Sequence, residues 1–226
     1  MKQKKTYGIT VLLAVMTVCA AMLTSCGLID KLGFDTYDYM SESVETTHET
    51  DGEVAETLTE LCGILLSDSS ELDTFSDMNG AINNYRDEVL AYMLKTGYAK
   101  YSGNTVLIEK AEREYPQYHI TQVIPEGEFE ATMYRVFGGS VKLTHRSGER
   151  FEYLDKVGAY ISPVMQESGD LTPRITYIGE TDKTYRVRFY VSQDGEDISD
   201  EYFALIIKRD DGTLYIKKLL NGNNVK

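Results

Sequence analysis

The stretch Thr184-Tyr185-Arg186-Val187-Arg188-Phe189-Tyr190-Val191 decides the fold class, because its side chains alternate between two kinds. One set is apolar or aromatic: Tyr185, Val187, Phe189 and Val191. The other set is basic or phenolic: Arg186, Arg188 and Tyr190. A period of two residues is typical of a β-strand with one buried face.

Two further strands are predicted after this stretch. Residues 202–208 are apolar on both faces, which is typical of a central strand. Asp210-Asp211-Gly212 then predicts a tight turn into an apolar-rich run over residues 214–219. Together with residues 173–179 ahead of it, the pattern predicts an antiparallel meander.

Shorter strand-like runs precede the meander. They cover residues 141–144, 150–154 and 157–162, with Ser147-Gly148 as a turn between the first two. We therefore expect the C-terminal part, residues 140–226, to form a sheet of five or six strands.

The part before the sheet, residues 53–139, has a helical period instead. We expect helices near residues 54–65, 78–95, 105–115 and 125–137. The spacing of Thr50-Asp51-Gly52-Glu53 predicts a capping box ahead of the first helix.

Helices followed by an antiparallel sheet predict one α+β domain over residues 53–226. In element order this resembles the NTF2-like and cystatin-like cones. The resemblance implies a curved sheet wrapped around helices. These helices would be the only elements available to cover the buried face of the sheet.

The first 25 residues are expected to be a signal peptide. A basic head, Met1 to Lys5, precedes an apolar run from Ile9 to Leu23 of about fifteen residues. That run is shorter than the roughly 20 residues of a membrane-spanning helix. The small residues that follow it are typical of the cleavage region of a secretory signal peptide. We expect no transmembrane helix in the mature chain.

The sequence Leu23-Thr24-Ser25-Cys26, at the end of the apolar run, resembles the bacterial lipobox. The resemblance implies cleavage before Cys26 and a diacylglycerol thioether on its sulfur, which would make the membrane a partner. Two acyl chains anchor a protein stably, whereas one holds it only marginally. We expect a lipid-anchored protein on the extracytoplasmic face of the cell membrane. The alternative is an ordinary signal peptide in which Cys26 is incidental.

Residues 26–52 are predicted to be an acidic, flexible tether. Residues 30–60 contain ten acidic residues and one lysine, and residues 41–51 are nearly all Ser, Thr, Glu and Asp. Such a composition cannot bury enough apolar surface to offset its ordering entropy. Calcium binding is the alternative, but the run lacks the spacing of a calcium loop.

Charge and cysteine content narrow the function classes. The chain of 226 residues has 23 basic and 36 acidic residues, a formal net charge of -13, which argues against nucleic acid as a partner. Cys19 would leave with the signal and Cys26 would carry lipid, so an intramolecular disulfide is not expected. We expect the remaining cysteine, Cys62, to be a small buried hydrophobe on its helix.

No signature of catalysis, a metal or a cofactor appears. The chain lacks the glycine-rich strand-to-helix motif of nucleotide-binding sites and the G-x-S-x-G motif around a nucleophilic serine. His48, His119 and His145 lack the spacing of a helical zinc site, and His48 is expected to be solvated. The acidic residues around Gly195 are expected to form a solvated loop, with a calcium site as the alternative.

The second face of the meander carries the candidate binding site. Its residues are Arg186, Arg188 and Tyr190, joined by Tyr215 and Lys217 from a neighbouring strand with the same alternation. Basic and tyrosine side chains on one sheet face can recognise an anion or a carbohydrate by bidentate bonds and stacking. The alternative is a plain exposed face, since Arg and Tyr suit strands.

The expected function is a non-catalytic binding module of the cell envelope, whose partner is an envelope protein, a glycan or a small anionic ligand. One alternative is an enzyme with a pocket in a cone-shaped sheet, and another is a small solute receptor. The chain also resembles uncharacterised lipoproteins of Firmicutes-type bacteria. Besides the lipobox, three stretches carry that resemblance: Ile124-Pro125, Glu128-Phe129-Glu130 and Phe137-Gly138-Gly139. It implies no activity for any residue.

Overall fold

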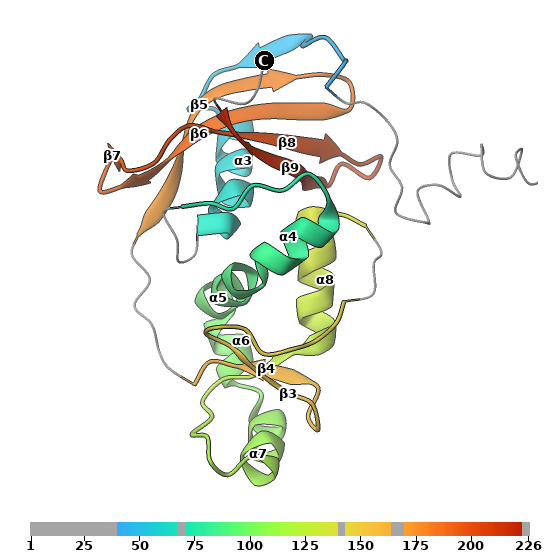
Figure 1. The fold of residues 1–226 in the computed structure, drawn as a ribbon, viewed down its shortest axis with the longest axis vertical. Helices are drawn as coiled ribbons and strands as arrows, with labels where there is room; N and C mark the ends of the chain where they lie inside the picture. Colours follow the sequence, from blue (N-terminus) through green and yellow to red (C-terminus); the bar gives the residue numbers. More distant parts are fainter. Residues whose placement is uncertain (1–39, 67–70, 140–142, 164–169, 223–226) are drawn as a thin grey trace, which may run out of the picture. The chain divides into compact units, whose positions relative to one another are not determined.

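The computed structural model describes residues 40–66, 71–139, 143–163 and 170–222 (Figure 1). The predicted signal peptide, Cys26 and the first part of the predicted tether lie outside these residues. Among the described residues, no helix is both long and apolar enough to cross a bilayer.

The larger sheet confirms the predicted meander. Its strands run antiparallel in the order β1-β5-β6-β8-β9, and a short strand, β7, pairs with β6. The strands are β1 (Thr46–His48), β5 (Leu171–Glu180), β6 (Thr184–Gln193), β7 (Glu196–Asp197), β8 (Tyr202–Lys208) and β9 (Leu214–Asn221). The predicted turn between β8 and β9 uses Gly212 at a φ of 81°, a conformation that glycine adopts without a steric penalty.

The alternation along β6 separates the two faces of this sheet. Val187, Phe189 and Val191 are fully buried on what we call the inner face. Arg186 and Arg188 point to the opposite, outer face, where they stand across from Leu205 and Phe203 of β8. The sequence pattern therefore assigned the faces of β6 correctly.

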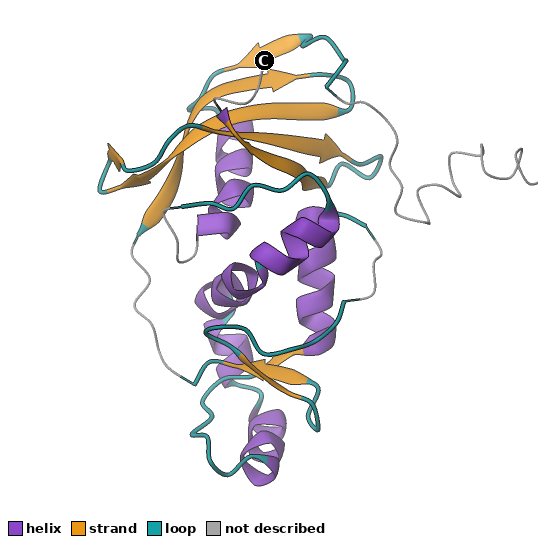
Figure 2. Ribbon diagram, viewed as in Figure 1, coloured by secondary structure: helices purple, strands orange, loops and turns teal. Residues whose placement is uncertain are grey.

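Seven helical segments are described between β1 and β5 (Figure 2). They are α3 (Glu53–Gly63), the 3-10 turn η1 (Ile64–Leu66), α4 (Met78–Asn84), α5 (Arg86–Thr96), α6 (Tyr98–Ser102), α7 (Thr105–Glu114) and α8 (Glu126–Phe137). The predictions for the first, third and fourth helices are confirmed to within a few residues. Helix α7 begins after Asn104, whose side chain accepts a hydrogen bond from the Leu107 amide at 3.3 Å.

Two local predictions about the helices are wrong. The helix expected over residues 78–95 is broken at Tyr85, whose hydroxyl donates to the Asp73 carbonyl at 2.6 Å and whose backbone leaves the helical region. The capping box does not form, because the residue that precedes α3 is Gly52 and no side chain caps this end.

Helices α3, α4, α5, α6 and α8 share one hydrophobic core with the inner face, so the fold is α+β with N-terminal helices packed on a C-terminal antiparallel sheet. Helix α3 packs on β5, and α8 packs on β9. At the end of α8, Gly138 has a φ of 71° and lies so close to the Tyr215 ring that a Cβ would be 2.5 Å from it. Cys62 is fully buried in this core, as predicted, and burial raises the pKa of its thiol to about 12.

A second, three-stranded sheet corrects the expectation of a single sheet. Strands β2 (Ile124–Pro125), β4 (Ala159–Ile161) and β3 (Glu152–Leu154) pair in that order, separately from the meander. Leu154, Ala159 and Ile161 of this sheet pack with Ala111 of α7 in a second hydrophobic cluster, whereas Ile124 and Tyr160 belong to the main core. The strand expected over residues 141–144 is not found at residues 143–144, and residues 141 and 142 lie outside the described part.

The boundary of the predicted tether also needs correction. Residues 46–48 form β1, which pairs with residues 178–180 of β5. The polar composition that predicted a solvated segment is compatible with an edge strand, because only the backbone needs to pair there. The described fold therefore begins ahead of Gly52.

Candidate functional site

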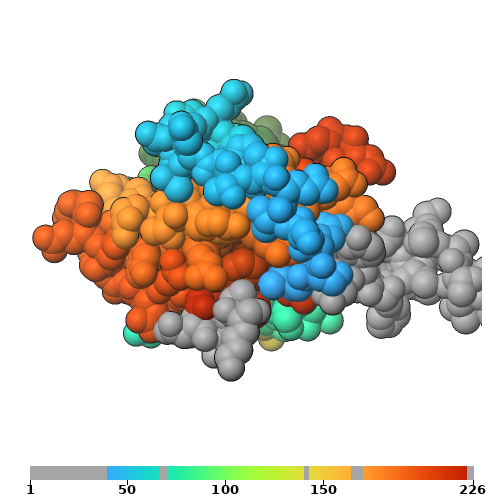
Figure 3. Space-filling view, turned by 90° about the horizontal axis from the view of Figure 1, so that it is seen from above, coloured from blue at the N-terminus to red at the C-terminus, as the bar shows by residue number. Residues whose placement is uncertain are grey.

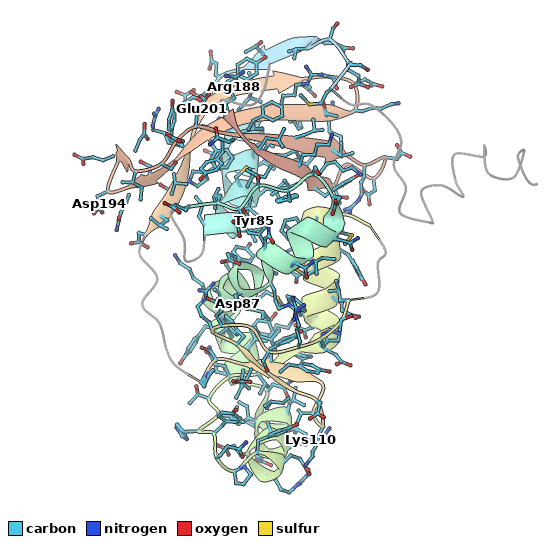
Figure 4. All side chains as sticks on the ribbon, viewed as in Figure 1. Tyr85, Asp87, Lys110, Arg188, Asp194 and Glu201 are labelled. Atoms are coloured by element: carbon cyan, nitrogen blue, oxygen red, sulfur yellow. The ribbon has the colours of Figure 1, made fainter. Side chains whose placement is uncertain are left out.

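The predicted site residues on β6 share the outer face, but each contacts another part of the chain. The Arg186 guanidinium donates to the carbonyls of Met40 and Glu42 at 3.2 and 2.5 Å. Arg188 forms an ion pair with Glu201 at 3.2 Å, and the two side chains are labelled next to each other in Figure 4. These two guanidinium groups therefore already bind oxygen atoms of this chain.

Tyr190 belongs to a separate polar group on the same face. The guanidinium of Arg174 lies over its ring, 5.2 Å from the centroid, and also pairs with both carboxylate oxygens of Asp197. The Arg174 partner holds the pKa of Asp197 below its ordinary value. The acidic loop around Gly195 thus supplies partners for the outer face: Asp197 for Arg174 and Glu201 for Arg188.

The other two predicted residues, Tyr215 and Lys217, lie on β9. Tyr215 stands across from Ile207 on the outer face, and the Arg209 guanidinium lies 4.7 Å from its ring centroid. A bulge between β8 and β9 then places Lys218, and not Lys217, across from Leu205. Lys217 is the extra residue of this bulge, so no residue of β8 stands directly across from it.

A cleft of about 680 Å³, which the sequence analysis missed, lies between α3 and the ends of two hairpins. We call it the α3 cleft. Its apolar lining comes from Val54 and Leu58 of α3, Tyr185 of β6 and Leu214 of β9. A volume between about 300 and 1,000 Å³ is typical of ligand sites. No sequence motif marks this cleft, because α3, the β5–β6 turn and the β8–β9 turn each supply only part of it.

The rim of the α3 cleft carries both signs of charge. Its cations are Lys183, Lys208 and Arg209, and its acids are Glu53, Asp182 and Asp210. Cations and acids thus lie around one opening, so the rim is suited to a partner that also carries both charges.

Two of these cations are held in place by the surrounding fold. Lys208 Nζ lies 2.9 Å from Glu180 and 5.2 Å from the Tyr185 ring centroid. Lys208, followed by His48, lowers the pKa of Glu180 below its ordinary value. Arg209 donates to the Tyr134 carbonyl at 2.9 Å. The positions of both charges at the rim are therefore held in part by residues outside the cleft, Glu180 for Lys208 and Tyr134 for Arg209.

His48 is not the solvated tether residue that the sequence predicts. Its Nε2 lies 2.5 Å from Glu180 Oε2, and its ring meets Tyr185 edge-on at 6.0 Å. The side chain is only 25% exposed, because β1 brings it against β5.

His145 is the centre of a polar cluster on α8 and the smaller sheet. Its Nδ1 lies 3.0 Å from the Tyr160 hydroxyl, its Nε2 lies 3.1 Å from Glu130, and its ring stacks on Tyr153. This carboxylate-imidazole-phenol arrangement resembles a catalytic relay. Tyr160, however, is fully buried, and burial raises the pKa of its phenol to about 12. The phenol cannot meet a substrate there, so the cluster joins α8 to the smaller sheet.

Metal-ligating side chains do not gather in the described part of the chain: no group of three or more His, Cys, Asp or Glu residues is placed to hold an ion. His119 is exposed on a loop.

Comparison with known proteins adds no assignment. No protein-family model, no curated protein and no solved structure matches this chain.

Proposed function

We propose that this chain is a lipid-anchored, non-catalytic binding protein on the extracytoplasmic face of the cell membrane. The observation that carries this proposal is the sequence Leu23-Thr24-Ser25-Cys26 at the end of an apolar run with a basic head. A diacylglycerol on Cys26 would supply two acyl chains, which is enough for stable anchoring.

The α3 cleft supports binding of a protein segment more than binding of a small free anion. Asp182 and Asp210 accompany the rim cations Lys183 and Arg209, and these acids would repel an anion that lacked a positive group. The apolar lining at Val54 and Leu214 suits an apolar side chain. The proposed partner is therefore an envelope protein that presents an apolar residue flanked by charges of both signs.

We further propose that the larger sheet wraps around α3 as in the NTF2-like and cystatin-like cones. The packing of α3 on β5 supports this proposal.

Anchoring is tested by Cys26→Ser, with Cys62→Ser as a matched control that leaves the lipobox intact. Cys26→Ser should move the protein from the membrane fraction to the soluble extracytoplasmic fraction, and Cys62→Ser should stay in the membrane. An unchanged distribution of Cys26→Ser would contradict the proposal.

Binding at the α3 cleft is tested with a photo-crosslinking residue in place of Asp182 in the anchored protein. Replacement of Tyr190 on the outer face is the matched control. We expect one crosslinked partner from the cleft position only, and its loss when Asp210→Lys reverses a charge at the same rim. Equal crosslinking from both positions, or none, would rule out this site.

A further inference from the structure

Residues 40–48 lie along the larger sheet and are called the strap here: a turn and bend at residues 40–42 lead into a segment that ends in β1. Four of its residues are partly buried: Met40, Glu42, Val44 and His48. Ser41 and Ser43, which alternate with the first three, are exposed. Figure 3 shows this segment, in blue, lying against the orange strands. Over residues 40–44 this alternation places one side of the chain towards the sheet, whereas residues 45–47 are all exposed.

The first end of the strap is bound to the outer face. Arg186 donates to two of its carbonyls, at Met40 and Glu42, and Thr181 donates to the Glu42 carboxylate. The Met40 side chain packs against the apolar residues of β8 that face outward: Phe203, Leu205 and Ile207. Arg186 therefore binds backbone oxygens, which any sequence would offer, and Met40 adds an apolar contact.

The second end of the strap is bound to the edge of the sheet. The Glu45 amide donates to the Glu180 carbonyl at 2.8 Å, and Thr46 to His48 pair with β5. His48 also contacts the Glu180 carboxylate. The strap thus has two points of attachment, one on the outer face and one on the edge strand.

These attachments differ in kind from the core beneath them. No side chain of the strap is fully buried, whereas β6 places Val187, Phe189 and Val191 in the core at 0% exposure. Segments with little buried apolar surface open at a lower free energy than the core does. The strap can therefore leave the sheet without unfolding it.

We propose that the strap docks on the sheet and releases from it as a separate unit, and that this sets the length of chain between the lipid anchor and the folded domain. The second part rests on the proposed lipid attachment at Cys26. With the strap docked, the connection is residues 27–39, thirteen residues. With the strap released it extends to Gly52, twenty-six residues. The fully extended reach rises from about 45 Å to about 90 Å.

Hydrogen exchange measured by mass spectrometry on the soluble chain without its signal tests the docking. Arg186→Ala removes the guanidinium that holds Met40 and Glu42, and Arg188→Ala is the matched control, because Arg188 pairs with Glu201 and not with the strap. Since hydrogen bonds to a charged donor are among the stronger ones, we expect exchange over residues 40–48 to become about tenfold faster in Arg186→Ala alone.

Three results would overturn the docking proposal. The first is unchanged exchange of the strap in Arg186→Ala. The second is an equal effect from Arg188→Ala. The third is faster exchange throughout β5 and β6, which would make the strap an inseparable part of the sheet. Arg186→Lys, which keeps the charge but loses the planar fork, should fall between the wild type and Arg186→Ala.

Neutron reflectometry of the lipidated protein on a supported phospholipid bilayer tests the linker length. Arg186→Ala should raise the mean height of the domain above the bilayer by less than the roughly 45 Å of added reach, because only molecules with a released strap have the longer connection. Faster strap exchange with no change in height would overturn the linker part of the proposal. Failure of both proteins to attach would instead refute the lipid anchor and leave the exchange result standing.

Discussion

The side chains on the two faces of β6 differ in the interactions they make. On the inner face, Val187 and Phe189 are fully buried against the helices, and their contribution comes from burial alone. On the outer face, Arg186 and Arg188 are partly exposed, and each binds an oxygen atom of another segment. The comparison teaches that one strand separates two tasks: its inner face stabilises the domain, and its outer face selects which segments lie over the sheet.

The largest expected effect is on the inner face. Phe189→Ala should lower the free energy of unfolding by about 3–5 kcal/mol, because it removes a fully buried ring and leaves a cavity. Tyr190→Ala, the next residue on the outer face, should cost less than about 1 kcal/mol. Urea denaturation of both variants measures the difference, and equal losses would contradict the separation of tasks.

A smaller effect is expected from a polar atom placed in the core beneath the inner face. Cys62→Ser should cost about 1–3 kcal/mol, because the hydroxyl is buried without a compensating partner. Cys62→Ala separates the cost of burying a polar group from that of the lost volume. If serine proves no worse than alanine in urea denaturation, the site is more polar than the structure indicates.

Alkaline pH should lower the free energy of unfolding through the buried thiol of Cys62. The pKa of the Cys62 thiol is raised by burial to about 12 from an ordinary 9.0, so between these values the unfolded chain ionises and the folded chain does not. The stabilising contribution is complete below pH 9 and is lost as the pH rises towards 12, by about 1 kcal/mol at pH 10. The pH dependence of unfolding should therefore be shallower in Cys62→Ala than in the wild type. Identical slopes would show that this thiol is not desolvated.

The smallest effect is expected from the ion pair on the outer face. A double-mutant cycle on Arg188→Ala and Glu201→Ala should give a coupling of about 0.2–1 kcal/mol, because both side chains are partly exposed at 39% and 24%. The coupling should fall with added salt. A value above 2 kcal/mol would place this pair among the interactions that stabilise the domain.

Periodicity was enough to predict the elements that bury a continuous face. The period of two along β6 and the apolar stripe of α3 both predicted what the structure contains, because burial imposes these spacings on the sequence. The same reasoning missed the break at Tyr85 and the strand β1. Both depend on partners outside the element itself, the Asp73 carbonyl for Tyr85 and the distant strand β5 for β1, and neither contact imposes a period on the sequence.

The candidate site could be predicted only in part for the same reason. Alternation placed Arg186 and Arg188 on one face, but it could not show that Met40, Glu42 and Glu201 would bind them. The α3 cleft was beyond prediction, because its lining comes from a helix and two turns that carry no common motif.

The proposed location, linker and partner class all follow from the modification of one sulfur atom, that of Cys26. The most direct test is the intact mass of the N-terminal peptide of the protein isolated from membranes. We expect a chain that begins at Cys26 with a diacylglyceryl group on its sulfur. A peptide that begins elsewhere, or an unmodified Cys26, would contradict it.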